Sequence, residues 1–428
     1  MRADFRGFAE ILCLAALVAG VMWYAPASES GAERLAIAAT AGLVILAALQ
    51  SSPAWFRGAG WYVLFIAAVT TGVLANPSAS SLLLYWHVLL FGSLAFVVTC
   101  ARHPRRAALT AVALFVALAG LVLVEALHYD VQGLTSRGAT LLIVSQWGGY
   151  PELGLLASLG AAAAIAVVSA PGRWPTKTLA GLAFAGFVLA ALAVLSRGAW
   201  VTIALVTAWA ILRTRRFGHH RLLTASVLLL AVLATVFTLY TSRAIQEYMS
   251  SFASPTDGLF VAFRLAQWRL AVGLIAEHPI VGVGLGGYAE ASAAVDQSLG
   301  SLHAHNTFLN MAAEAGLPAA VLWVGLWIRI LWKSLSAAGA GSLAAWTLHC
   351  MLAAFFIRSQ IDAFVMLRPR LLILLGIFFG LSEALYATTA ARGTAAGLPV
   401  RRVPAASTVD SGVVRAPAAR AEDSPGSA

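Results

Sequence analysis

The run 107–127, AALTAVALFVALAGLVLVEAL, decides the fold class of this chain. Glu125 is its one charged residue, and the run has the length of about 20 apolar residues that a helix needs to cross the hydrocarbon core of a bilayer. Lipid offers no hydrogen-bond partners to the backbone, so a spanning segment must satisfy its own N–H and C=O groups, as a helix does. The run therefore predicts a transmembrane helix.

Similar runs fill most of the chain, and the composition agrees with them. Of 428 residues, 60% are hydrophobic and 11% are charged, whereas a soluble domain has about 25% charged residues. The mean hydropathy is +0.84. The runs are continuous rather than alternating, which argues against a β-barrel. The sequence predicts an all-α integral membrane protein with about twelve transmembrane helices and one large, partly helical outer loop. We expect these helices near 8–26, 33–50, 60–76, 81–100, 107–127, 152–170, 177–195, 198–213, 221–241, 307–332, 340–358 and 369–388.

The basic residues predict the orientation of the chain. Its net charge is +10, and with both termini placed inside, 19 of the 28 Lys and Arg residues fall in inside segments and the other 9 outside. This bias favours cytoplasmic termini. Scattered over membrane loops, the positive charge forms no single patch and argues against nucleic-acid binding. The outside arginines go against the bias, and we expect some of them to have a functional role. They are Arg34, Arg137, Arg197, Arg243, Arg264, Arg269, Arg358, Arg368 and Arg370.

Four parts follow along the chain. Residues 1–241 hold the first nine spans, 242–306 form the large outer loop, 307–388 hold the last three spans, and 389–428 form a tail predicted to be disordered and cytoplasmic. Inside the outer loop, 259–277 is a predicted helix that is apolar around most of its circumference and is expected to lie against the membrane domain. His278-Pro279 should end it, because a residue before proline avoids the α region.

The outer loop ends in a short polar phrase, His303-Ala304-His305-Asn306. Asn306 is a candidate N-cap for the helix that follows. A neutral imidazole can act as a general base near neutral pH, which makes His305 a candidate catalytic residue and His303 a weaker one. A structural role for either histidine stays open from the pattern alone.

Two arginines lie in the predicted loop helix. Arg264 shares a face with Gln267 and Trp268, which are three and four residues away. Arg269 is about 140° further around the helix and is not expected to point at the same site. Arg264 is therefore the better candidate for a bound anion, and Arg269 could equally meet lipid headgroups.

Arg197 lies in a very short outer connection, Ser196-Arg197-Gly198. An arginine at that depth is costly unless it is paired or faces a watery cavity, so an anion contact and a snorkelling anchor both remain possible. The outer loop has no Asp-x-Asp pair to hold a divalent ion on a diphosphate, so arginines would have to supply the positive charge there. The glycine-rich stretch 282–287 lacks the Lys-Ser/Thr of a nucleotide-binding loop and predicts a flexible turn.

Three motifs, in this order, resemble the O-antigen ligase/polymerase superfamily. Ser196-Arg197-Gly198 resembles its upstream arginine motif. The stretch 264–284, with Arg-x3-Trp and then Glu-His-Pro-Ile-x-Gly-Val-Gly, is similar to its loop signature. His305-Asn306, nine residues and then Gly316 match its His-Asn-x9-Gly phrase. The family phrase usually continues Gly-x-x-Gly/Thr/Tyr, whereas 317–319 here are Leu-Pro-Ala, which keeps a small residue at the last position.

The resemblance implies a glycosyltransferase of the bacterial inner membrane that works on the periplasmic side. Such ligases move a glycan from undecaprenyl diphosphate to a sugar hydroxyl of lipid A–core, so the donor, the acceptor and membrane lipids are the expected partners. No cofactor and no metal are expected, and a single displacement would invert the anomeric carbon. The resemblance implies catalytic roles for His305, Arg197 and Arg264. The expected substrate-binding residues are Arg269, Gln267, Trp268, Asn306 and His303.

Other functions remain open at this point. An O-antigen polymerase uses the same donor, and a protein O-oligosaccharyltransferase uses a different acceptor. The single dominant outer loop, followed directly by the His-Asn phrase, favours a ligase, because polymerases often divide their polar sequence between two outer loops. A transporter usually shows paired repeats or interrupted helices near the midplane, and the sequence has no matching interruption in two halves.

Overall fold

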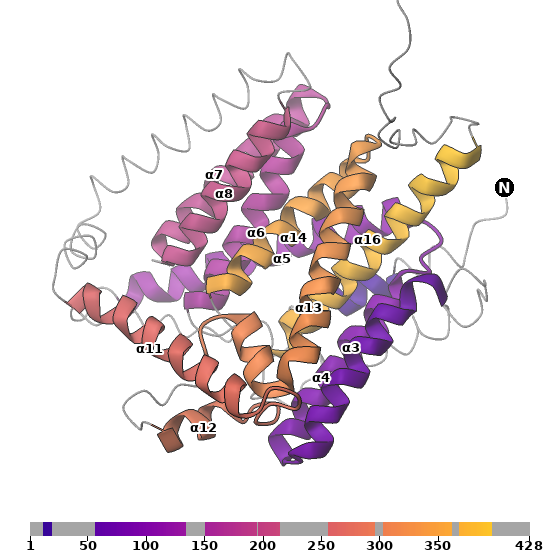
Figure 1. Cartoon of the computed structure of the whole chain (residues 1–428). Coiled ribbons are helices and arrows are strands. Elements are labelled where there is room, and N and C mark those ends of the chain that lie inside the picture. The colour runs from indigo at the N-terminus through magenta and orange to yellow at the C-terminus, as the bar shows by residue number, and fades with distance from the viewer. Residues whose placement is uncertain are drawn as a thin grey trace, which may run out of the picture. The chain divides into compact units, whose positions relative to one another are not determined.

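The computed structural model describes residues 12–18, 56–133, 150–194, 196–214, 256–295, 303–361 and 368–395. Within these ranges the regular structure is helical and no strand occurs (Figure 1). The helices are α3 (Phe56–Ala75), α4 (Ala79–Val98), α5 (Pro104–Gly133), α6 (Tyr150–Ser169), α7 (Trp174–Ala193), α8 (Arg197–Thr214), α11 (Thr256–Glu277), α12 (Tyr288–Val295), α13 (Thr307–Gly339), α14 (Leu343–Ile361) and α16 (Pro369–Ala395).

The helices confirm an all-α protein that crosses the membrane several times. Among the described residues, 6 helices are long and apolar enough to span a bilayer. They lie in α4, α5, α6, α7, α13 and α16. α3, α8 and α14 also form over predicted spans without being among those six. The spans expected at 33–50 and 221–241 lie outside the described residues, so the total of about twelve stays a prediction.

α6 is the central helix of the bundle. It packs against α5, α7, α8 and α14, and 94% of its span is buried within the protein. Its sequence is rich in Ala and Gly, and small residues let helices approach closely in a membrane. At Gly160 a Cβ atom would overlap the ring of Phe187 on α7. The close packing thus follows from the missing side chains.

α11 and α12 are the described helices of the predicted outer loop. α11 ends at Glu277, directly before His278-Pro279, which confirms the predicted stop. Both helices contact α13, and Figure 1 shows them beside its first turns. The predicted loop residues 242–255 and 296–302 lie outside the described ranges.

α13 is broken near its start, and the break forms what we call the loop–helix joint (279–284 against 313–317). Pro318 has no N–H, so it leaves the Glu314 carbonyl without its helical donor. The Gly284 N–H donates to that carbonyl instead, at 2.9 Å. The Leu317 N–H turns away to the Pro279 carbonyl at 2.8 Å, and the Ala313 carbonyl accepts from the Val283 N–H at 2.8 Å. These groups, which the break releases from the helix, thus find partners in the loop.

Two glycines make the joint possible. Gly282 and Gly316 have φ values of 68° and 85°, a region in which a side chain is disfavoured. A Cβ atom on Gly316 would overlap the Ile280 carbonyl, and one on Gly282 would overlap the Glu314 backbone. The glycine-rich stretch is a turn, as predicted, but it is packed against α13 rather than flexible.

Three helices extend well beyond their predicted ends, and one of them is α13, which continues to Gly339. α5 continues to Gly133 and so enters the predicted outer loop 128–151, of which 134–149 lie outside the described residues. α16 continues to Ala395, so it overlaps the start of the predicted tail 389–428. A first compact unit runs to Thr389 and a second begins at Ala390. Residues 396–428 lie outside the described part of the chain.

Candidate functional site

The polar phrase at the start of α13 is a tight turn with a left-handed residue. His305 has φ 51°, which is uncommon for a residue with a side chain and is found disproportionately at functional sites. Its backbone N–H donates to Nδ1 of His303 at 3.2 Å, and the two rings meet edge to face with centroids 4.3 Å apart. Nδ1 of His303 accepts this bond and is therefore unprotonated. The bond ties the His303 ring to the backbone of His305 and so helps to shape the turn.

Asparagines hold this turn on both sides. Asn306 is the N-cap of α13, as predicted, because its Oδ1 accepts from the Phe308 and Leu309 N–H groups at 2.9 and 3.1 Å. Asn310, which is buried, accepts the Ala304 N–H at 3.0 Å. The backbone on each side of His305 is therefore fixed by side chains of the helix that it precedes.

α11 reaches the turn through Phe263. The Phe263 ring meets the His305 ring edge-on at 6.3 Å between centroids, and Arg264 is the next residue along the helix. Arg264 is half-buried, whereas Arg269, about 140° further around the helix, is exposed. Trp268 buries its Nε1 without a hydrogen-bond partner among the described residues.

Gln267 was expected to bind substrate, and it also has a role inside the protein. It is fully buried, and the Tyr288 hydroxyl donates to its side-chain oxygen at 2.9 Å and lies 3.0 Å from its backbone carbonyl. Burial and, to a smaller degree, the Glu314 carboxyl raise the pKa of Tyr288 to about 12, so the phenol remains a donor at neutral pH. The contact ties α12 to α11.

Ser196-Arg197-Gly198 is clamped between two helices. Ser196 is buried against α6, where a Cβ atom on Gly154 would overlap its hydroxyl. On the other side, a Cβ atom on Gly198 would overlap the guanidinium of Arg358 from α14. The two small residues of the motif thus let neighbours approach the backbone on each side of Arg197. The Arg197 side chain itself is half-buried at the start of α8.

The end of α14 connects this clamp to the His305 turn. The Nδ2 of Asn306 donates to the Gln360 carbonyl at 3.1 Å. One residue later, Ile361 lies next to Gly198, where its Cγ2 would be 3.3 Å from an added Cβ. Two sets of contacts therefore connect the predicted residues to the His305 turn. Phe263 connects Arg264 to the turn, and the end of α14 connects Arg197 to it.

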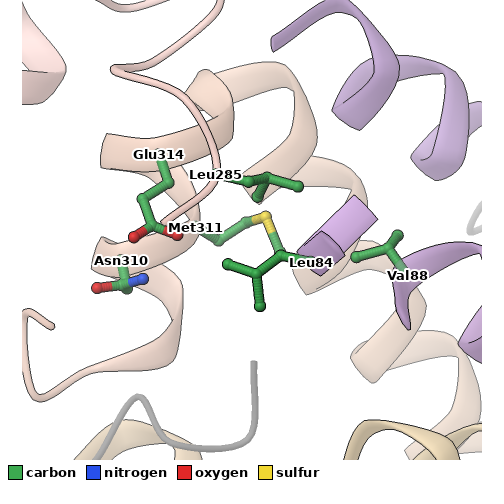
Figure 2. Close-up of a pocket in the computed structure, with 6 residues that line it drawn as sticks. All are labelled: Leu84, Val88, Leu285, Asn310, Met311 and Glu314. Carbon is green, nitrogen blue, oxygen red and sulfur yellow. The ribbon is translucent and has the colours of Figure 1, made fainter. Parts of the chain in front are cut away.

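No sequence motif assigned a role to Glu314, but the structure gives this residue one. The backbone N–H groups of Gly286 and Tyr288 point at its buried carboxylate, with Tyr288 N 3.4 Å from Oε1. Beside it lies a small pocket with room for about one water molecule. Figure 2 shows Glu314 and Asn310 at the polar end of this pocket. The pocket is lined by Leu84, Val88, Leu285, Asn310, Met311 and Glu314.

Arg358 and Gln360 were not predicted as part of the site. Arg358 appeared among the outside arginines, but no spacing in the sequence links it to Gly198, which lies on another helix. Gln360 contributes a backbone carbonyl, which any residue has. The break in α13 near Glu314 did have a signal in the sequence. Pro318, four residues later, removes the donor that the Glu314 carbonyl would use in a helix.

Comparison of the sequence with known protein families gives a match, which covers much of the candidate site. Residues 182–324 match the O-antigen ligase family. This range contains Ser196-Arg197-Gly198, all of α11 and α12, the His305 turn and the loop–helix joint. This match supports membership of the chain in the O-antigen ligase family. No curated protein matches the chain.

The family match supports a general class of activity for this chain. O-antigen ligase family proteins carry out a ligase or polymerase type of glycosyl transfer, with a lipid-linked glycan and an acceptor as substrates. The apolar helices and the family match together indicate a multi-pass membrane protein. The matched residues are the same region in which the three sequence motifs occur.

Proposed function

We propose that this protein is an O-antigen ligase that transfers a glycan from undecaprenyl diphosphate to a sugar hydroxyl of lipid A–core. The observation that carries the proposal is the left-handed His305 in a turn held by Asn306 and Asn310, inside the region that matches the family. A strained backbone persists only where surrounding contacts impose it, and such residues gather at functional sites. This supports a catalytic rather than a merely structural histidine.

His305 acts as the general base in the proposed reaction. The acceptor hydroxyl attacks the anomeric carbon from the face opposite the diphosphate, its proton passes to the His305 ring, and the bond to the phosphate oxygen breaks. A single displacement of this kind inverts the anomeric carbon and releases undecaprenyl diphosphate. Proton transfer to a positioned base contributes about 10²–10⁴-fold to such a rate.

Arg197 and Arg264 stabilise the departing diphosphate. Negative charge grows on its oxygens as the glycosyl bond breaks, so cations fixed in place before the reaction favour the transition state over the ground state. The clamp around Arg197 and the half-buried position of Arg264 support this role. The proposed binding surface also includes the indole N–H of Trp268 and the side chains of Arg269, Gln267, Asn306 and His303.

The reaction takes place on the periplasmic side of the bacterial inner membrane in this proposal. Twelve spans with both termini in the cytoplasm put α11, the His305 turn and Arg197 on that side. Both substrates are lipids, so confinement in one leaflet brings the reacting groups together. The arginines replace a metal ion as the source of positive charge.

Reconstitution with the donor and separate acceptors tests the proposal. Purified protein in vesicles receives an undecaprenyl-diphosphate glycan with lipid A–core, with more lipid-linked glycan, or with an acceptor protein. We expect transfer to lipid A–core, unchanged by a chelator. Elongation of the lipid-linked glycan would instead indicate a polymerase, transfer to protein an oligosaccharyltransferase, and uptake without transfer a transporter. Activity that a chelator removes and magnesium restores would contradict the metal-free mechanism.

A further inference from the structure

Arg358 is a buried arginine that the proposed reaction does not use. Its side chain is 2% exposed, and its Nη2 donates to the Pro151 carbonyl at the start of α6 at 3.1 Å. The guanidinium also packs directly against the backbone of Gly198 at the start of α8. One side chain of α14 therefore fixes the beginnings of two other helices, and one of these helices carries Arg197.

The chemistry of the contact explains why both partners are what they are. A guanidinium is planar and presents several N–H donors in a fixed fork, so it can lie flat against a peptide while donating to a carbonyl nearby. A lysine would offer one flexible ammonium. On the other side, any residue larger than glycine at 198 would place its Cβ in the guanidinium. Arg358 and Gly198 are thus matched in shape.

The same turn of α14 touches the other half of the candidate site. The Gln360 carbonyl accepts from Nδ2 of the N-cap Asn306 at 3.1 Å, and Asn306 adjoins His305. The last turn of α14 is therefore a shared support, with Arg358 facing the arginine motif and Gln360 facing the histidine turn. A shift of this turn would move one relative to the other.

We propose that Arg358 is a positioning residue that holds Arg197 in register with His305. Arg358 acts through the backbone of Gly198 and does not itself touch substrate, in keeping with its burial. The inference rests on the proposed function, because it assigns Arg197 to the donor diphosphate. This role also gives a reason for Arg358, one of the arginines predicted on the outer side of the membrane against the general bias of positive charge toward the inside.

A double-mutant cycle tests the coupling. Arg358→Gln and Arg197→Lys are made alone and together, and binding of undecaprenyl diphosphate is measured beside kcat and the KM for each substrate. We expect each single change to weaken donor binding about tenfold and to leave the acceptor KM unchanged, with the double variant close to the Arg197→Lys variant. Arg358→Lys should restore only part of the loss.

Two further variants sharpen the result. Gly198→Ala pushes on the guanidinium without changing charge, and we expect it to reproduce Arg358→Gln. Arg213→Gln changes the same chemistry at the other end of α8, about 24 Å away by helix rise, and should combine additively with Arg197→Lys. If Arg358→Gln does not accumulate in the membrane, the cycle is run with Gly198→Ala in its place.

The outcomes separate the inference from the proposed function. Full additivity of the Arg358 and Arg197 changes, unaltered donor binding, or a fall in kcat alone with both KM values unchanged would overturn the positioning role. Coupled binding of the lipid diphosphate without glycan transfer by the wild type would contradict the ligase and leave the positioning role standing. A wild-type protein that does not bind the lipid diphosphate would contradict both.

Discussion

Two histidine environments in this protein differ in how the ring is held. His349, in α14, is buried, and both ring nitrogens are bonded: Trp209 Nε1 donates to Nε2 at 3.2 Å, and Nδ1 lies 2.9 Å from the Ser334 hydroxyl. Its ring also stacks on Trp346. His305 lies in a left-handed turn outside any helix, is half-buried, and has its backbone fixed by His303 and by neighbouring asparagines.

The difference shows which kind of histidine environment suits a catalytic role in a membrane protein. An indole N–H can only donate, and the Ser334 hydroxyl donates onward to the Leu331 carbonyl, so His349 is held as a neutral ring with Nδ1 protonated. Such a ring joins α8, α13 and α14 and has no nitrogen left for a substrate. In the His305 turn, side chains instead accept hydrogen bonds from backbone N–H groups before, at and after His305. These bonds fix the backbone that carries the His305 ring.

The largest expected effect comes from replacing the two histidines in turn. His305→Ala should lower glycan transfer about 10²–10⁴-fold while the protein accumulates normally. His349→Ala should leave transfer per folded molecule unchanged but lower the free energy of unfolding by about 1–3 kcal/mol, because it removes the hydrogen-bond partner of the Trp209 indole N–H and of the Ser334 hydroxyl. Transfer assays and thermal unfolding in detergent measure both. Full transfer by the His305 variant would remove the contrast between the two regions.

The loop–helix joint gives the next largest effect. Gly316→Ala places a side chain at φ 85° and against the Ile280 carbonyl, and we expect a loss of about 2–5 kcal/mol in the free energy of unfolding. Gly120→Ala in α5 is the matched control, since nothing lies within 4 Å of its Cβ. Thermal unfolding of the two variants compares them. Equal stability of the two variants would mean that the positive φ and the close contact at Gly316 do not constrain the joint.

A smaller effect is expected at the arginine motif. Arg197→Lys keeps the charge but loses the planar fork that binds two oxygens at once, so the kcat/KM for the donor should fall about tenfold. Lysine for arginine at Arg213, at the opposite end of α8, should change it little. Equal losses at the two positions would indicate a general effect on α8 rather than a contact with the diphosphate.

The smallest expected effect concerns the tie between α11 and α12. Tyr288→Phe removes the hydroxyl that donates to Gln267 and should cost about 1 kcal/mol in the free energy of unfolding. Because the pKa of Tyr288 is raised to about 12, its hydroxyl stays protonated in wild type at every pH below that value. The difference between the two proteins in thermal unfolding should therefore be the same at pH 6 and pH 9.

Local sequence predicted those parts of the site that depend on neighbouring residues. The end of α11 at His278-Pro279 and the N-cap role of Asn306 are both confirmed, because proline and side-chain capping act within one turn. The role of the glycine-rich stretch was only half predicted. Its positive φ values fit a turn, but its packing depends on a proline about thirty residues away.

The sequence by itself determined the class of the protein, the family motifs and those helical spans that the structure describes, because burial in lipid requires long apolar helices whatever their arrangement. The tertiary structure decided which of the polar residues meet. Arg358 reaches Gly198 and Gln360 reaches Asn306 across helices that are far apart in the chain. Such contacts depend on how close two helices approach, and at Gly198 the missing side chain permits an approach that no local pattern predicts.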